Sequence, residues 1–91
     1  MNHLTEEGLK KPCVFIIRVG VPLLTLKNIL SYLDSRRIGI ETLQLHAFDA
    51  NESIVILYCM IERDRIKYTK LAMEKLDGII KLELLESRAL K

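Results

Sequence analysis

The chain has 91 residues, of which 49% are hydrophobic and 29% charged, and this length suits one small globular domain rather than two. Fourteen basic residues against twelve acidic ones leave a net charge of +2, which argues against a dedicated nucleic-acid binder or a polybasic membrane anchor. No apolar run approaches the ~20 residues that cross a bilayer, and the N-terminus lacks the hydrophobic segment of a signal peptide, so we expect a cytoplasmic protein outside the membrane.

The first part of the chain predicts an arm, a strand and a helix. Residues 1–12 are polar and lack a hydrophobic period, which is typical of a flexible N-terminal arm. Residues 13–19 form a short β-branched run bounded by Pro12 and Gly20, which predicts a strand. Pro22 then opens a helix, because its fixed φ suits the first turn. The expected buried stripe of this helix consists of Leu23, Leu26, Ile29, Leu30 and Leu33, and Arg36 and Arg37 fall in its last turn.

The hydrophobic period changes from that of a helix to that of a strand over residues 38–48, which predicts an edge strand. Ile40 is out of phase with the later apolar residues, so we expect a bulge near Glu41 and Thr42. The apolar face of this strand comprises Leu43, Leu45 and Ala47.

The second part of the chain predicts a hairpin partner, a helix and a last strand. Residues 53–62 return from a polar turn and pair with the preceding strand. A helix begins at Asp64 and ends at Gly78, and residues 79–85 form the last strand. The expected buried residues of this helix are Ile66, Thr69, Met73 and Leu76.

The element order is therefore β-α-β-β-α-β over residues 13–86, followed by a short tail at 87–91. Right-handed crossovers place both helices on one face of a four-stranded antiparallel sheet. We therefore predict an α+β fold of the ferredoxin-like βαββαβ type, with one sheet face left uncovered by helices.

This uncovered face is expected to be apolar. A sheet face in water normally alternates toward polar residues, but the strand at 53–62 is apolar on both faces. The predicted patch comprises Val14, Ile16, Ile54, Ile56, Tyr58 and Met60, with Arg18 at its rim. A patch of this kind reaches several hundred Å², which rarely stays uncovered on a monomer. We therefore predict a protein interface and a homodimer or higher homo-oligomer; the alternative is that Tyr58, Met60 and the arm cover the patch within one chain.

The sequence shows no pattern of a catalytic or metal site. His3 and His46 have no second metal ligand at a fixed short spacing. Cys13 and Cys59 are expected to be neighbours on adjacent strands, as buried free thiols. A basic cluster is expected to be a solvated helix face; it consists of Arg63, Arg65, Lys67 and Lys70. We therefore expect neither an enzyme nor a cofactor or metal.

Two segments resemble a known family. The stretch Arg37-Ile38-Gly39-Ile40-Glu41-Thr42-Leu43, which enters a strand directly from a helix, resembles the R-G-x-x-I-E-S-L passage of ACT domains. The likeness is greatest to the small regulatory subunit of acetolactate synthase (acetohydroxyacid synthase), whose K-L-x-x-V-x-x-V ending resembles Lys75-Leu76-Asp77-Gly78-Ile79-Ile80-Lys81-Leu82. The resemblance covers residues 13–86 and implies an ACT-type domain, a ligand-sensing and dimerising module, of the short single-domain type.

The resemblance also implies where an amino-acid effector would bind. In ACT domains the loop after the first strand carries Asn or Asp and then Gly, and the second strand of a neighbouring domain supplies the other wall. The matching positions here are Val21 and Leu24, with Gly39 and Ile40 near the second strand. Leu24 places a bulky side chain where bare backbone is expected, so the implied pocket is vestigial. Short isoforms that lack this glycine are associated with activation of the catalytic subunit.

The sequence leaves three functions open. The first is a non-catalytic regulatory subunit in branched-chain amino-acid biosynthesis, which dimerises through residues 38–48 and docks on a thiamine-diphosphate-dependent acetolactate synthase large subunit. The second is a free-standing ACT amino-acid sensor with a pocket of Val21, Leu24, Gly39 and Ile40. The third is an RNA-binding domain of the same topology, which is disfavoured because only Tyr58 is placed to stack a base.

Overall fold

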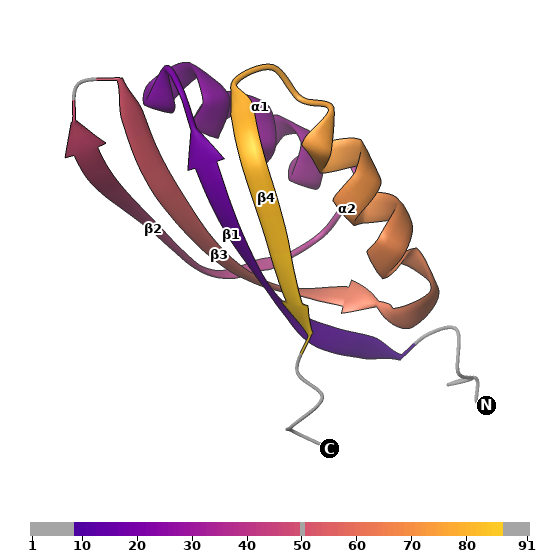
Figure 1. The fold of residues 1–91 in the computed structure, drawn as a ribbon. Helices are drawn as coiled ribbons and strands as arrows, with labels where there is room; N and C mark the ends of the chain where they lie inside the picture. The colour runs from indigo at the N-terminus through magenta and orange to yellow at the C-terminus, as the bar shows by residue number, and fades with distance from the viewer. Residues whose placement is uncertain (1–8, 50, 87–91) are drawn as a thin grey trace.

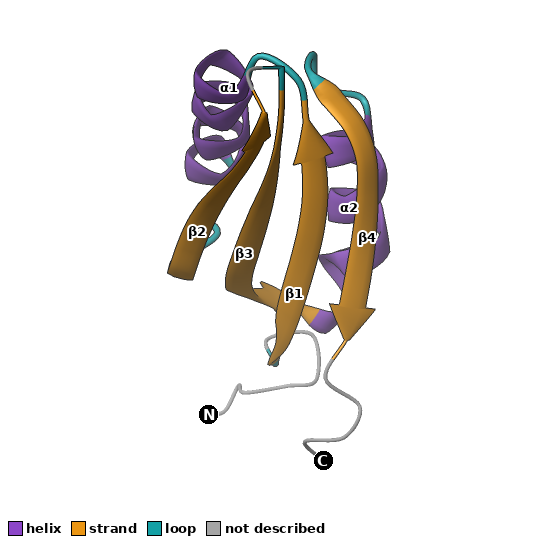
Figure 2. Ribbon diagram, turned by 60° about the vertical axis from the view of Figure 1, so that its left-hand side comes forward, coloured by secondary structure: helices purple, strands orange, loops and turns teal. Residues whose placement is uncertain are grey.

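The structure is a computed structural model that describes residues 9–49 and 51–86. Its elements in chain order are β1 (Lys10–Val19), α1 (Pro22–Ser35), β2 (Ile40–Asp49), β3 (Glu52–Glu62), the 3₁₀ turn η2 (Arg63–Arg65), α2 (Ile66–Glu74) and β4 (Ile79–Glu86). The strands form one antiparallel sheet in the order β2-β3-β1-β4, and both helices lie on the same face of it (Figures 1 and 2). The predicted ferredoxin-like α+β sandwich is confirmed.

Strand β1 begins three residues earlier than the sequence indicates. Lys10, Lys11 and Pro12 pair with the end of β3, so they belong to the sheet and not to the arm. Proline is tolerated at this end of the strand because, among the residues that the structure describes, β4 pairs with β1 from Cys13 onward and not at Pro12. The rest of the predicted arm, residues 1–8, and the tail at 87–91 lie outside the described residues.

The predicted bulge in β2 is confirmed. Ile40 pairs with Cys59 and Thr42 pairs with Tyr58, so Glu41 is the extra residue. The strand starts at Ile40 rather than residue 38, because Ile38 is still held by the end of α1.

The core fills the layer between the sheet and the two helices. Phe15 pairs with Leu57 and Ile17 with Val55 across the two central strands, and all four side chains are fully buried. Helix α2 buries Ile66, Thr69 and Met73, as the sequence predicts, while Leu76 lies just beyond the helix and is half-buried.

Helix α1 faces the sheet with a different stripe from the predicted one. Its buried residues are Thr25, Ile29 and Leu33, whereas Leu23 and Leu30 are exposed. With 100° between successive residues, this corresponds to a rotation of roughly 60° about the helix axis. The prediction for Leu23 and Leu30 is therefore wrong, although the helix itself is where the sequence places it.

Thr25 explains this rotation. Its hydroxyl donates to the main-chain oxygen of Gly20, with Oγ1 at 2.6 Å, and lies 3.0 Å from that of Val21. Its side chain also packs against Gly78, whose φ of +94° is in the region that favours glycine. The Gly20 amide donates to the Gly78 carbonyl at 2.9 Å. The turn after β1 and the turn before β4 are thus held together through Thr25.

Replacement of Gly78 by alanine should destabilise the fold. The added Cβ would lie 1.9 Å from Thr25 Oγ1 and 2.9 Å from Thr25 Cβ, on a backbone that L-residues rarely adopt. We expect Gly78→Ala to lower the free energy of unfolding by about 2–4 kcal/mol, measured by urea denaturation.

Gly39→Ala is the matched control. No atom lies within 4 Å of a Cβ at Gly39, and its φ is outside the left-handed region. This variant should be as stable as the parent or more stable by up to ~1 kcal/mol, because alanine reduces the entropy of the unfolded chain. Equal destabilisation by the two substitutions would contradict the role given to Gly78.

Candidate functional site

The six predicted interface residues lie together on the sheet face away from the helices. Cross-strand pairing sets Val14 opposite Tyr58 and Ile16 opposite Ile56, at the centre of the sheet. Ile54 and Met60 extend the same row of β3 toward its two ends. Each of the six side chains is half-buried rather than fully exposed, because its neighbours on the face cover part of it.

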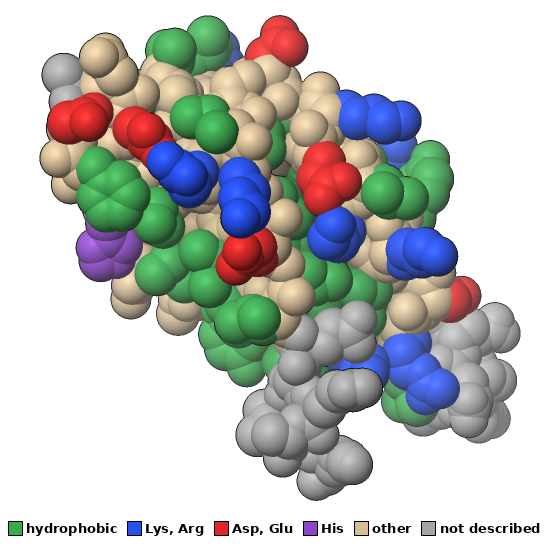
Figure 3. Space-filling view, viewed as in Figure 1, with side chains coloured by type: hydrophobic (Ala, Val, Ile, Leu, Met, Phe, Trp, Pro, Cys, Tyr) green, Lys and Arg blue, Asp and Glu red, His purple; other side chains and the backbone are tan. Residues whose placement is uncertain are grey.

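Polar and charged side chains border this apolar centre. On one side the pairing places Gln44 and His46 of β2 opposite Ile56 and Ile54, and His46 Nε2 lies 3.2 Å from Gln44 Oε1. On the other side Lys81 and Glu83 of β4 form an ion pair at 3.5 Å. The space-filling view shows hydrophobic side chains gathered over the strands with basic and acidic ones among them (Figure 3).

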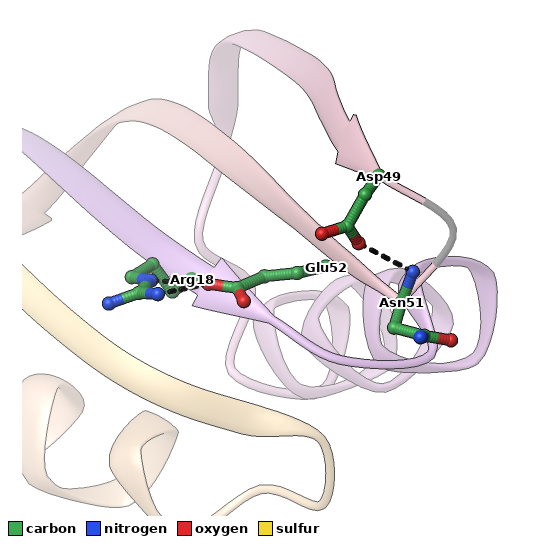
Figure 4. A network of polar contacts seen from close by, with 4 residues as sticks. All are labelled: Arg18, Asp49, Asn51 and Glu52. Atoms are coloured by element: carbon green, nitrogen blue, oxygen red, sulfur yellow. Dashed lines mark hydrogen bonds and ion pairs between the residues drawn. The ribbon is translucent and has the colours of Figure 1, made fainter.

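An ion pair borders this face at the end nearest the turn between β2 and β3. Arg18 Nε donates to Glu52 Oε2 at 2.6 Å, and a second guanidinium nitrogen contacts the same oxygen. Nearby, the main-chain amide of Asn51 donates to Asp49 Oδ1 at 2.7 Å, and this bond stabilises the turn between β2 and β3 (Figure 4). The face is therefore amphipathic, with an apolar centre on β1 and β3 that Leu85 of β4, opposite Val14, extends at one end.

Strand β2 is the most exposed element of the sheet. Among residues 9–49 and 51–86 it pairs with β3 alone, so the main-chain donors and acceptors of its outer edge have no partner strand there. Every residue of β2 except Leu43 is exposed, including Leu45 at 39% on the side of the sheet that carries the helices. The rotation of α1 leaves two more leucines exposed, Leu23 at 77% and Leu30 at 39%. The flank of the domain at α1 and β2 is therefore both apolar and unpaired.

The predicted effector residues fall into two groups in one chain. Val21 and Leu24 lie at the start of α1, and both side chains are exposed. Gly39 and Ile40 lie after its other end, about 21 Å away for a helix of 14 residues. One chain therefore does not bring the four residues together.

The turn at the start of α1 has an unusual backbone. Val21, the residue before Pro22, has φ 42° and ψ 66°, a left-handed conformation that is rare for a β-branched residue. A depression opens beside it, lined by Gly20, Val21, Pro22, Leu23 and Asn51. Leu23 and Asn51 were not predicted to contribute to this site, since only the fold brings the hairpin turn beside the start of α1.

The two cysteines are buried neighbours, as predicted. Cys13 and Cys59 pair across β1 and β3, and both are thiols outside any disulfide with no exposed surface. Burial raises the pKa of the Cys59 thiol from its ordinary value of 9.0 to about 12, and the adjacent Cys13 adds to the rise. The Cys59 thiol therefore stays protonated at neutral pH, which is the opposite of what a reactive cysteine needs.

Within residues 9–49 and 51–86, no group of three or more His, Cys, Asp and Glu side chains is placed to hold a metal ion. In the same ranges, no helix has the length and hydropathy to cross a membrane. Of the predicted basic cluster, Lys70 pairs with Glu74 at 2.6 Å, and Arg65 lies 3.9 Å from Glu62.

Comparison with solved structures supports the ACT-type fold. The ACT domain of GTP pyrophosphokinase from Chlorobium tepidum has a TM-score of 0.70 and 17% sequence identity, over 84% of this chain and 99% of that one. An uncharacterized protein from Thermotoga maritima has a TM-score of 0.69 and 14% identity, over 87% and 99%. The C-terminal domain of MgtC from Mycobacterium tuberculosis has a TM-score of 0.63 and 13% identity, over 97% and 98%.

No family model matches the chain. No curated protein matches it significantly either. At identities below 20% the solved structures are informative about the fold, and the chain has the ACT-type variant of the ferredoxin-like fold.

The raised pKa of Cys59 predicts that stability falls with pH in the alkaline range. Between pH 9 and 12 the unfolded chain loses the Cys59 proton while the folded chain keeps it, so deprotonation favours unfolding. We expect the free energy of unfolding at pH 10 to be lower than at pH 8 by about 1 kcal/mol from this group, measured by urea denaturation under reducing conditions.

The control is Cys59→Ala, which lacks the titrating thiol. Its overall stability should be lower because it leaves a cavity, but its loss between pH 8 and 10 should be smaller than that of the parent. The same pH dependence in both proteins would contradict the assignment to Cys59.

Proposed function

We propose that the chain is a non-catalytic regulatory domain that acts as a homodimer formed through β2. The observation that carries this proposal is the exposed flank of α1 and β2. The outer edge of β2 pairs with no other strand of the described residues. Three leucines beside it are exposed: Leu23 at 77%, Leu30 at 39% and Leu45 at 39%. An uncovered edge strand recruits a further strand, and a second copy offers one of matching length and apolar pattern.

Antiparallel pairing of β2 with itself would join two sheets into one of eight strands. The helices of both copies would lie on the same face, so Leu30 and Leu45 of each copy would meet the same flank of the other. An isologous contact of this kind closes as a two-fold dimer and leaves no further β2 edge.

This dimer would also assemble the effector pocket. Antiparallel pairing places the start of one β2 beside the end of the other, next to the hairpin turn that flanks Val21. Gly39 and Ile40 of one copy would then face Val21 and Leu24 of its partner. The complete pocket would form only between two copies. The part that one chain supplies is lined by Gly20, Val21, Pro22, Leu23 and Asn51, so its side chains are apolar apart from Asn51.

The proposed partner is the thiamine-diphosphate-dependent large subunit of acetolactate synthase. The support for this partner is the sequence resemblance at residues 37–43 and 75–82, together with the amphipathic sheet face. This face has an apolar centre with a charged rim, which is the usual composition of a protein interface. The domain would dock through Val14, Ile16, Ile54, Ile56, Tyr58 and Met60.

A second candidate is a free-standing amino-acid sensor. The left-handed Val21 beside an open depression favours it, because strained backbone often marks a ligand site. The sensor would use the same dimer and the same pocket, but it would have no catalytic partner.

A charge at the centre of β2 should break the dimer. Leu45→Lys leaves the monomer core intact, since the side chain is already exposed, but it buries two lysines at the two-fold contact. We expect sedimentation to give twice the 10.5 kDa chain mass for the parent and a dissociation constant about 100-fold higher or more for the variant.

The matched control is Leu71→Lys on α2, which makes the same change at a leucine of 47% exposure away from β2. It should remain a dimer. A monomeric parent chain, or equal dissociation of the two variants, would refute dimerisation through β2.

Docking on the synthase is tested by mixing the chain with the purified large subunit. We expect co-elution and a higher catalytic rate, both lost in the double variant Ile16→Thr/Ile56→Thr. Threonine keeps the β-propensity of this cross-strand pair and removes its apolar surface. Leu71→Lys again serves as the control and should activate normally.

The same preparation separates the two candidates. The sensor is favoured if the chain neither co-elutes with the synthase nor activates it, and if an amino acid raises its melting temperature. An amino acid at 100 times its Kd should raise the free energy of unfolding by ~2.7 kcal/mol. If no amino acid raises the melting temperature, the sensor function is excluded.

A further inference from the structure

A second cavity lies at the opposite end of α1 from Val21, and its lining is strongly basic. It has a volume of about 230 Å³ and is formed where β1 begins, α1 ends, β3 ends and η2 begins. Four cationic side chains line it: Lys10, Arg36, Arg37 and Arg65. Among the described residues, Glu62 is the one acidic residue of the lining, and the buried Ile61 contributes an apolar wall.

The positive charge of this cavity is poorly neutralised within the described part of the chain. Glu62 lies 3.9 Å from Arg65, and both side chains are well exposed, so this contact is weak. Arg36 lies over the Tyr32 ring, 5.5 Å from its centroid. Neither Lys10 nor Arg37 forms an ion pair with an acidic side chain of residues 9–49 and 51–86.

The backbone at Arg37 is a second and independent observation. The Arg37 amide donates to the Asp34 carbonyl and the Ile38 amide to the Leu33 carbonyl, both at 3.0 Å. These two bonds define a Schellman motif, in which Arg37 occupies the left-handed position that glycine normally takes. Its φ is 58°, so the arginine is strained where glycine would be relaxed. A strained arginine at the mouth of a basic cavity indicates a role for its side chain.

The Schellman motif also removes an obstacle to anion binding. Free carbonyl groups at the end of a helix repel anions. Here the carbonyls of Leu33 and Asp34 are paired by the motif, and that of Tyr32 accepts from the Arg36 amide at 3.2 Å. The guanidinium groups of Arg36 and Arg37 therefore lie at a helix end where the carbonyls of residues 32–34 are already hydrogen-bonded.

We infer that this cavity binds a compact small molecule with at least two anionic groups, of the diphosphate class. Guanidinium groups bind phosphate oxygens in pairs, and their charge is satisfied by several oxygens at once. A volume of about 230 Å³ is below that of most drug-sized ligand pockets, so the ligand is small. The cavity lies at the other end of α1 from Val21 within one chain, and its binding does not require the proposed effector pocket, although its lining residue Ile38 directly precedes Gly39.

The test uses inorganic pyrophosphate as the probe and the full-length chain labelled with ¹⁵N. We expect saturable chemical-shift changes at the amides of Arg37, Ile38, Ile61 and Glu62, and binding that weakens as salt is raised. Orthophosphate, with fewer oxygens to share among the cations, should bind at least tenfold more weakly. Citrate is the carboxylate counterpart, and tighter binding of citrate than pyrophosphate would overturn the phosphate assignment.

Arg37→Gly separates binding from folding. Glycine relaxes the left-handed position, so the melting temperature should not fall, yet pyrophosphate binding should weaken about tenfold. Arg65→Gln should weaken binding similarly. The matched control is Arg63→Gln, which removes the same charge from the same turn at a residue outside the cavity lining and should change binding less than twofold.

Three further results would overturn the inference. One is the absence of saturable shifts at millimolar pyrophosphate. The second is equal weakening by Arg63→Gln and Arg65→Gln, which would mean that only net charge matters. The third is unchanged binding in Arg37→Gly.

Discussion

The rotational setting of helix α1 determines which surfaces of this domain are left open. Thr25 is the inward-facing residue of the first turn, because its hydroxyl bonds to the Gly20 carbonyl and its side chain packs on Gly78. With Thr25, Ile29 and Leu33 directed at the sheet, Leu23 and Leu30 are directed outward. The helix then covers β3 but leaves β2 almost entirely exposed. A small polar contact between two turns thus creates the apolar flank on which the proposed dimer rests.

Both ends of α1 carry a strained residue. Val21 before the helix and Arg37 after it are the two non-glycine residues with positive φ in the described ranges 9–49 and 51–86. Each left-handed residue of this kind costs on the order of 1 kcal/mol, and glycine or asparagine would avoid most of that cost. Each also lies beside a depression of the surface. Local strain therefore coincides with two of the depressions in the surface of the domain.

Periodicity was sufficient for most of the fold. The two-residue repeat of a strand divides residues 53–62 into two sets of side chains, and the expected pairing of Cys13 with Cys59 across β1 and β3 is confirmed. The out-of-phase Ile40 likewise locates the bulge. These features depend on local sequence, because a strand repeats every two residues whatever its neighbours are.

The setting of α1 and both cavities depend on contacts between distant segments. The leucines of α1 have a helical spacing that fits two different faces, and only the contact of Thr25 with Gly78 selects between them. The left-handed φ of Arg37 could not be predicted from the sequence either, because two arginines are typical of an ordinary helix end. The basic cavity is assembled from four elements, and no stretch of sequence contains more than two of its cations.

The structure also ranks the two apolar surfaces. The six residues on the open sheet face are each half-buried by their neighbours, and the Arg18–Glu52 and Lys81–Glu83 pairs border them. Burial by a partner is favoured more strongly at the flank of α1 and β2. This flank combines leucines exposed by 39–77% with main-chain groups that have no partner strand among the described residues. Water can satisfy those groups, but pairing with a second strand would satisfy them and bury the leucines together. In the proposal, dimerisation through β2 therefore comes before docking through the sheet face, an interaction that such a dimer would be able to make twice.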